Sequence, residues 1–339
     1  MRTAEHVVMV TGGLGFIGSN LVNCLASRDD VARVVVVDSS SHPLESLTNL
    51  ILRPNPKVEI HTADITDLEM LIELSRGCNI IYHLAAETHV QRSIITPLPF
   101  ALTNIMGSFS VLEVARKLSC RLIHISTSEV YGSLVGTDID ENSPLQPFSP
   151  YAATKLAADH LVLSYVRTYK VKATIIRMFN AYGPGQHFEK VIPMFICSVL
   201  CGLPLPIQGN GNAVRDLTYV ADVCLRLERL LGLTLPFVVC NTGSGNALSV
   251  LELAQRISNL AGISDPEIVK FPERPGHVSH QMANVGKANE YLGQAETPLD
   301  QGLGLTFDWY RHNIARWRDN FLEARTTLLD EMRKTGGPA

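Results

Sequence analysis

The 339-residue sequence predicts an α/β protein in which a doubly wound parallel sheet carries a smaller α/β lobe. Three observations support this prediction. A glycine-rich turn follows the first apolar strand, an aspartate ends the second strand, and short apolar strands alternate with helix-like segments through the first half of the chain. Such alternation is typical of parallel sheets, whose ligands bind at the carboxyl ends of the strands.

The first expected strand, residues 7–10, leads into TGGLGFIGSN, whose glycines have the spacing G-x-x-G-x-x-G. We interpret this segment as the nucleotide-binding turn of a Rossmann-type sheet. Its glycines allow a tight turn and let the backbone approach a pyrophosphate at the N-terminus of the next helix, about residues 16–27. The predicted cofactor contacts in this turn are Gly12, Gly15, Phe16, Ile17 and Gly18.

The second expected strand, residues 34–37, ends in Asp38, twenty residues after Gly18. A carboxylate at this place is expected to hold the ribose hydroxyls of adenosine and would repel a 2′-phosphate. Ser39 to Ser41 supply no arginine that could accept such a phosphate. The sequence therefore predicts NAD rather than NADP.

Further strands are expected at residues 58–61, 79–84 and 121–125. Their carboxyl ends should open into the same crevice as the glycine turn. The additional cofactor contacts predicted from these ends and from the next helix, residues 102–118, are Asp64, Ile65, Leu84, Ala85, Ala86 and Thr103.

The candidate catalytic pair is Tyr151 and Lys155, four positions apart at the start of a helix-like run. Both side chains then lie on one helical face, so the ammonium can lower the phenol's pKa from about 10 and create a general base for a hydroxyl group. Thr127-Ser128-Glu129, which lies 22 residues upstream, adds hydroxyls and a second acid/base group. A lone Tyr-x-x-x-Lys is more often a surface pair, but together with the glycine turn this set favours an enzyme.

The sequence resembles the extended short-chain dehydrogenase/reductases that act on nucleotide sugars, and most of all their dTDP-glucose 4,6-dehydratase branch. The resemblance covers nearly the whole chain. It rests on TGGLGFIGSN, HLAAETHVQRSI, TNIMGSFSVLEVAR, STSEVYG, SPYAATK, FNAYGPGQHFEKVIP, LPLPIQGNGNAVRDLTYVAD and ERPGH.

The resemblance implies an NAD-dependent 4,6-dehydratase. Tyr151, assisted by Thr127, would remove the C4 hydroxyl proton of the sugar while hydride passes to NAD. The resulting ketone acidifies C5, so Glu129 can remove that proton, water leaves from C6, and hydride returns to C6. The product would be a 4-keto-6-deoxy sugar nucleotide, and NAD would stay bound through each cycle.

One position departs from the dTDP-glucose pattern. Ser128 stands where those enzymes have the aspartate thought to protonate the departing hydroxyl, and Thr-Ser-Glu is instead similar to GDP-mannose 4,6-dehydratases, some N-acetylhexosamine 4,6-dehydratases and UDP-glucuronate decarboxylases. Glu129 favours elimination or decarboxylation over simple epimerisation. UDP-glucuronate decarboxylase and nucleotide-sugar 4-epimerase therefore remain alternatives, and the nucleotide base and the C2 substituent are left open.

Prolines after Arg177 interrupt the strand–helix rhythm. We predict an NAD-binding domain at 1–180 with a returning segment at about 211–245, interleaved with a substrate lobe at 181–339. Arg215 is the first candidate for the pyrophosphate, because a guanidinium suits phosphate oxygens, with an ion pair to Asp216 as the alternative. The positions that the resemblance assigns to the substrate are Thr88, Asn180, Glu189, Lys190, Arg215, Arg274 and His277.

The composition of the chain bears on its binding partners and its location. A net charge of -4 gives no electrostatic case for nucleic acid or anionic membranes. We expect a cytoplasmic protein, because no signal segment and no apolar stretch near 18 residues is evident. No metal site is predicted, and the polar tail from about Arg325 is expected to fray.

Apolar residues on more than one face of the helices at 102–118 and 151–169 suggest a homodimer, since family members pair these helices. Two other classes of protein have the same fold: a catalytically idle nucleotide-binding protein, and a reductase that releases NADH in every turnover. The intact set of catalytic candidates argues against the first.

Overall fold

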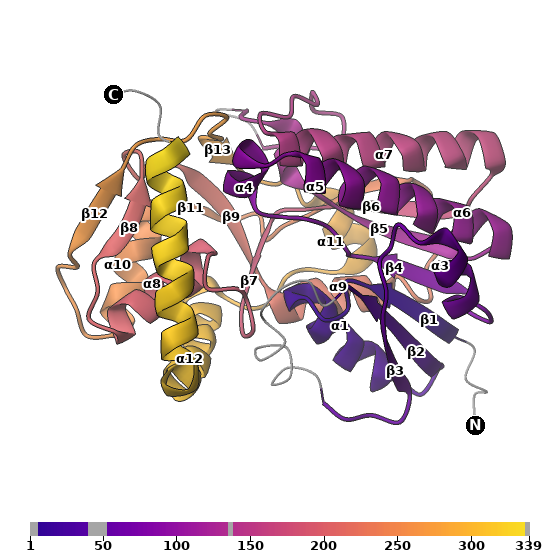
Figure 1. Cartoon of the computed structure of the whole chain (residues 1–339), viewed down its shortest axis with the longest axis horizontal. Coiled ribbons are helices and arrows are strands. Elements are labelled where there is room, and N and C mark those ends of the chain that lie inside the picture. Colours follow the sequence, from indigo (N-terminus) through magenta and orange to yellow (C-terminus); the bar gives the residue numbers. More distant parts are fainter. Residues whose placement is uncertain (1–5, 40–52, 135–137, 336–339) are drawn as a thin grey trace.

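The computed structural model describes residues 6–39, 53–134 and 138–335, and it confirms the predicted α/β class. Seven strands of this part of the chain form one parallel sheet in the order β10-β6-β5-β4-β1-β2-β3 (Figure 1). The run β3-β2-β1-β4-β5-β6 is the Rossmann order. Its strands are β1 (His6–Thr11), β2 (Val31–Asp38), β3 (Val58–Thr62), β4 (Ile80–His83), β5 (Arg121–Thr127), β6 (Ala173–Met178) and β10 (Val239–Thr242).

The sheet is covered by helices on both faces. In β2, Val34 and Val36 pack into the core on one face and Val35 and Val37 into the core on the other, which explains the unbroken valine run. One face carries α3 (Leu68–Leu74), α6 (Ser108–Leu118) and α7 (Pro150–Tyr169). The other face carries α1 (Phe16–Ala26), α9 (Val220–Arg229) and α11 (Gly286–Leu292).

A second apolar core forms the smaller lobe, in which α8 (Val191–Leu200), α10 (Val250–Leu260) and α12 (Leu299–Thr335) pack together. Two small sheets complete the lobe. One pairs β9 (Val214–Tyr219) with β7 (Asn180–Tyr182), β11 (Ala247–Ser249) and β13 (His280–Gln281), and the other pairs β8 (Leu205–Gln208) with β12 (Ile268–Phe271). The segment that comes back to the main sheet consists of α9 and β10, whereas β9 lies outside that sheet.

The helical run beside α7 is irregular. It comprises α5 (Leu98–Phe100), the π-helical stretch η1 (Ala101–Gly107) and α6, after the short helix α4 (Val90–Ile95). By length and composition alone, Leu98–Leu118 could cross a membrane, so the expectation of no such stretch was too strict. Half of the most apolar window of this helix is buried inside the protein. A single helix of this kind is weak evidence for a membrane span, because a core helix can have the same length and composition.

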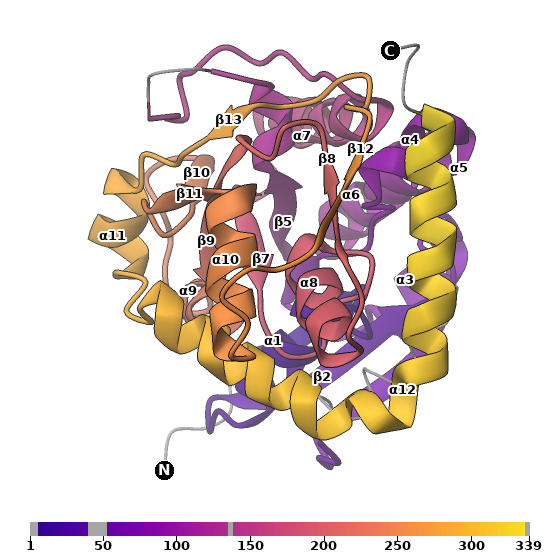
Figure 2. The ribbon, with the colours of Figure 1, turned by 90° about the vertical axis from the view of Figure 1, so that its left-hand side faces the viewer.

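The expectation of a frayed tail from about Arg325 was wrong for the described residues. Helix α12 continues to Thr335, with a kink at Trp317, and Figure 2 shows its final part turning up beside α4. Phe321 and Leu328 are buried seven residues apart, so they lie on one helical face and dock it on the protein. The prediction failed because the segment is polar on average, although its few apolar residues lie on one helical face. The rest of the expected tail, 336–339, lies outside the described residues.

Candidate functional site

The glycine turn between β1 and α1 forms a cradle that only glycine can build. A Cβ placed on Gly18 would stand 2.1 Å from the carbonyl oxygen of Gly12, and one on Gly12, whose φ is +70°, would stand 2.5 Å from the Ala85 nitrogen. Backbone segments therefore approach each other at the N-terminus of α1, where amide groups can receive a phosphate. This geometry fits the predicted dinucleotide.

We predict that Gly18→Ala lowers the NAD affinity of the protein by at least about tenfold, equivalent to about 1.4 kcal/mol. The added methyl group would meet backbone rather than a movable side chain, so the turn itself must shift. NAD released from heat-denatured protein measures the occupancy. Gly304→Ala in α12 is the control, because its Cβ meets nothing within 4 Å. Full NAD occupancy in Gly18→Ala would contradict this assignment.

The other predicted cofactor residues lie at the same edge of the sheet. The Asp38 carboxylate at the end of β2 accepts a hydrogen bond from the Leu14 amide in the glycine turn, at 3.0 Å. Asp64 instead accepts from the amide and hydroxyl of Thr66, and Ile65 is buried against Gly107 of η1. Ser40 and Ser41 lie outside the described residues. Partly buried positions are held by Phe16, Ile17, Leu84, Ala85, Ala86 and Thr103.

Asn104 of η1 links the segment after β4 to helix α7. Its amide nitrogen donates to the Glu87 carbonyl at 3.1 Å and to the Thr154 hydroxyl at 3.0 Å, and its oxygen accepts from the Glu87 amide at 2.8 Å. The side chain is buried, so these bonds are shielded from water. Sequence reasoning missed Asn104, because its partners become neighbours only in the folded chain.

Tyr151 and Lys155 lie buried in the first turns of α7, beside the end of β5. The Lys155 ammonium donates to the Ile125 carbonyl at 2.6 Å, and burial lowers the pKa of Lys155 to about 8, although Asp159 opposes the shift. Burial raises the pKa of Tyr151, and a hydrogen bond with Thr127 partly offsets this. The effect of the Lys155 ammonium on the pKa of Tyr151 stays a prediction.

A polar network that the sequence did not reveal lies behind Lys155. Asp159, one helical turn further along α7, is fully buried and accepts a hydrogen bond from the Arg177 guanidinium at 2.9 Å. The His124 ring lies 3.6 Å from Asp159, and the His83 ring packs against His124. Burial, followed by the charge of Lys155, lowers the pKa of His83 to about 3. The buried surroundings of Lys155 therefore combine groups from β4, β5, β6 and α7 itself.

Glu129, which follows β5, lies within electrostatic reach of three cations. Burial lowers the pKa values of Arg215, Arg274 and Lys190, and in each case the Glu129 carboxylate opposes the shift, so all three feel its charge. The Nε atom of Arg274 is buried without a hydrogen-bond partner among the described residues. The group as a whole carries excess positive charge, as a diphosphate site requires.

Arg215 does not form the alternative ion pair with its neighbour. Its guanidinium donates to the carbonyls of Val214 and Val278, whereas Asp216 accepts hydrogen bonds from the loop after β10 and from Ala283. Adjacent side chains on a strand point to opposite faces, which separates the two charges.

The remaining substrate candidates differ in their surroundings. His277 is 3.5 Å from Glu273, and a Cβ on neighbouring Gly276 would stand 2.1 Å from the Phe148 carbonyl, so this loop lies against the segment before Tyr151. Thr88 and Asn180 are exposed. Glu189 is already engaged by other side chains, described below.

Ser128 is buried, and its hydroxyl donates to the side-chain oxygen of Gln281 in β13 at 3.2 Å. This bond ties the end of β5 to the smaller lobe. The structure thus gives Ser128 a partner in the protein, and its catalytic role stays a prediction.

The chain matches known proteins over nearly its full length. A family model described as GDP-mannose 4,6 dehydratase matches residues 9–304. The dTDP-glucose 4,6-dehydratase of Mycobacterium tuberculosis (strain ATCC 25618 / H37Rv) is 36% identical, covering 92% of this chain and 95% of the relative. The low-salt glycan biosynthesis protein Agl12 of Haloferax volcanii is 38% identical, with coverages of 89% and 98%.

Solved structures agree with this relationship. DesIV, a dTDP-glucose 4,6-dehydratase from Streptomyces venezuelae with NAD and TYD bound, has a TM-score of 0.87 at 34% identity and covers 92% of this chain and 99% of its own. The UDP-glucuronic acid 4-epimerase of Bacillus cereus, in complex with UDP-glucuronic acid and NAD, has a TM-score of 0.84 at 29% identity, with coverages of 90% and 99%. The chain belongs to the GDP-mannose 4,6-dehydratase family of extended short-chain dehydrogenase/reductases.

Proposed function

We propose that the protein is an NAD-dependent nucleotide-sugar 4,6-dehydratase, a hydro-lyase. The observation that carries this proposal is the position of Glu129, whose amide donates to the Thr127 hydroxyl and whose carboxylate lies within electrostatic reach of Lys190, Arg215 and Arg274. A diphosphate-bearing sugar would be held by the cations with its ring between Tyr151 and Glu129. The similarity to dTDP-glucose 4,6-dehydratases supports the same reaction.

NAD, when bound, supplies hydride acceptance at C4 and hydride return at C6. The glycine turn and Asp38 would hold it. Tyr151 takes the C4 hydroxyl proton, with Thr127 as hydrogen-bond partner. Lys155 supplies positive charge close to the tyrosine and stays fixed through the Ile125 carbonyl. Glu129 removes the C5 proton and delivers it to the leaving C6 hydroxyl, which accounts for elimination without an aspartate at position 128.

Decarboxylation and 4-epimerisation remain the alternatives, since an epimerase of this fold is similar at 29% identity. Mass spectrometry after incubation with dTDP-, UDP-, GDP- and CDP-hexoses and with UDP-glucuronate separates them. Loss of water supports the proposal. Loss of CO2, or only isomers of unchanged mass, would overturn it. NAD that remains bound without being added in each turnover would exclude the reductase.

We also propose that the molecule is a homodimer. Leu98, Leu102, Met106 and Phe109 form an exposed apolar stripe along α5, η1 and α6, with exposed fractions from 37% to 65%. Such a stripe on a soluble protein indicates an interface. We expect light scattering at micromolar concentration to give twice the chain mass, and Met106→Glu to give the monomer mass. A wild-type monomer would refute this interface.

We also propose a domain division and a location for the protein. We infer that the NAD domain comprises residues 1–180 with a returning segment and that the substrate lobe comprises most of 181–339. We also infer a cytoplasmic enzyme that requires neither nucleic acid nor a membrane. The described residues contain no group of three or more His, Cys, Asp or Glu side chains that could hold a metal ion.

A further inference from the structure

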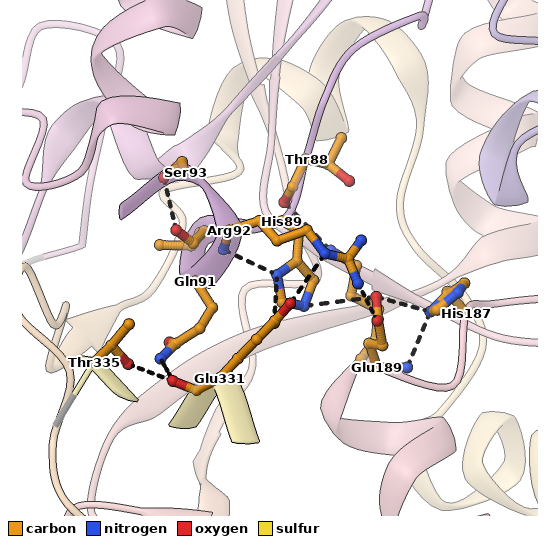
Figure 3. A network of polar contacts seen from close by, with 11 residues as sticks. Thr88, His89, Gln91, Arg92, Ser93, His187, Glu189, Glu331 and Thr335 are labelled. Carbon is orange, nitrogen blue, oxygen red and sulfur yellow. Dashed lines mark hydrogen bonds and ion pairs between the residues drawn. The ribbon is translucent and has the colours of Figure 1, made fainter. Parts of the chain in front are cut away.

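A cluster of charged side chains joins three segments that are far apart in the sequence (Figure 3). His89 and Arg92 belong to the start of α4, Glu189 precedes α8, and Glu331 comes from the last turns of α12. The exposed fractions of the two carboxylate side chains are only 7% for Glu189 and 12% for Glu331. Two carboxylates so well shielded from water require a fixed counter-charge.

Arg92 supplies that charge to both. Its Nη2 atom donates to Glu189, and its Nε atom donates to Glu331 Oε1 at 3.2 Å. The His89 ring lies between the carboxylates, 3.7 Å from Glu189 Oε2 and 3.8 Å from Glu331 Oε2. Because burial, followed by nearby cations, lowers the pKa of His89 to about 2, the imidazole is neutral near pH 7, and the Arg92 guanidinium is the cation that pairs with both carboxylates.

The cluster reaches directly to a candidate substrate residue. Lys190 follows Glu189 in the chain, and its ammonium donates to the Thr88 carbonyl at 3.3 Å, next to His89. It also lies within the electrostatic reach of Glu129. The Lys190 side chain is thus held by a carbonyl next to His89, while its backbone amide donates to the His187 carbonyl at 3.0 Å and its chain neighbour Glu189 pairs with Arg92.

Helix α12 anchors this arrangement from outside. Gln91 donates to the backbone carbonyl of Glu331 at 3.1 Å, which joins α12 to α4 on the main domain. On the lobe side, Arg325 donates to the Pro204 carbonyl at 2.9 Å, and the Arg333 guanidinium lies 5.8 Å from the ring centroid of Phe271. The end of α12 therefore spans from the lobe to α4 (Figures 1 and 2).

We propose that Glu331 is a positioning residue for Lys190, acting through Arg92 and Glu189. The inference rests on the proposed function, because it takes Lys190 as a contact of the nucleotide sugar. The Arg92 side chain is 34% exposed, so without the Glu331 carboxylate it keeps one of its two charged partners, Glu189, and its position is less fixed. Glu189 would then be held less firmly on the Arg92 side, with His89 and His187 as its other neighbours, and the segment that presents Lys190 would shift.

The test compares Glu331→Gln with Asp330→Asn, which removes the same charge one position earlier. The Asp330 carboxylate is exposed and forms an ion pair with Arg333 at 2.7 Å, one turn along α12. For Glu331→Gln we expect the KM for the nucleotide sugar to rise roughly tenfold, less than the ~10²-fold that a 1 Å misplacement can cost. We expect kcat and NAD content to change by less than about twofold, since Tyr151 and the glycine turn lie elsewhere. Asp330→Asn should match the wild type.

A double-mutant cycle tests the route of the effect. In a Lys190→Met background, Glu331→Gln should add little to the loss of substrate affinity. Equal effects with and without Lys190 would overturn the proposal. So would a lower melting temperature in Glu331→Gln with an unchanged KM, because that pattern describes a purely structural contact.

Hydrogen–deuterium exchange of the ligand-free protein provides a readout that does not depend on the reaction. Faster exchange at residues 187–190 in Glu331→Gln, but not in Asp330→Asn, is expected. Unchanged exchange at these residues would overturn the positioning role of Glu331 even if the enzyme is a dehydratase. If the wild type converts no nucleotide sugar, the proposed function fails, and this measurement alone decides whether Glu331 fixes the segment.

Discussion

Tyr151→Phe is expected to lower kcat by about 10²–10⁴-fold, the usual contribution of a positioned general base. The phenylalanine ring fills the same buried space, so the fold and NAD content should be preserved, but no group remains to take the C4 hydroxyl proton. Turnover of the nucleotide sugar and NAD released after denaturation are the two measurements. A catalytically idle nucleotide-binding protein would show no change in either.

Tyr165→Phe is the matched control for this variant. Tyr165 lies on the same helix, and its hydroxyl donates to Glu113 at 2.9 Å, away from the end of β5. It should retain wild-type kcat. If Tyr151→Phe kept activity within tenfold of wild type, the assignment of the base would be wrong, and the raised pKa of Tyr151 would describe an ordinary buried phenol.

Glu129→Gln is expected to separate the two halves of the reaction. Oxidation at C4 depends on Tyr151, whereas proton removal from C5 needs the carboxylate. Overall turnover should therefore fall by about 10²–10⁴-fold, while bound NAD is converted to NADH on addition of substrate and persists in that form. Absorbance of the reduced nicotinamide follows this step, and mass spectrometry follows the loss of water.

Ser128→Ala serves as the comparison for Glu129→Gln. The Ser128 hydroxyl is occupied by Gln281, so its loss should change turnover by less than about tenfold, within the range of a neutral hydrogen bond. A collapse of elimination in Ser128→Ala would instead identify the serine as the acid that the aspartate of related enzymes provides. Wild-type product formation by Glu129→Gln would reject elimination by this carboxylate.

Much of the main domain could be predicted because its signals are local. The valine run of β2, the glycines before α1 and the spacing of Tyr151 and Lys155 each act over a few residues. The spacing of apolar residues therefore predicted the strands, and the glycine turn predicted the edge of the sheet at which the cofactor binds. The π-helical stretch η1 escaped prediction, because its apolar and polar residues fit an ordinary helix equally well and its irregularity is set by packing against α7 and Ile65.

The tail shows the opposite case. Arg325 to Thr335 has the polar composition of a frayed end, yet it is helical and buries Leu328. Its stability comes from partners such as Arg92, which is 239 residues from Glu331 in the chain. A contact over that separation leaves no periodic signal, and only the folded lobe brings the two charges together.

The sequence by itself determined the sheet, the cofactor turn and the candidate catalytic pair of Tyr151 and Lys155, because each depends on short-range spacing that fixes local geometry. Only the tertiary structure decided the electrostatics around them. In the folded chain, the Lys155 ammonium donates to the Ile125 carbonyl, and three cations lie within electrostatic reach of Glu129. Glu189 lies between Arg92 and His89. The physical reason is that charge interactions depend on distance and burial through space, and neither is encoded by position along the chain.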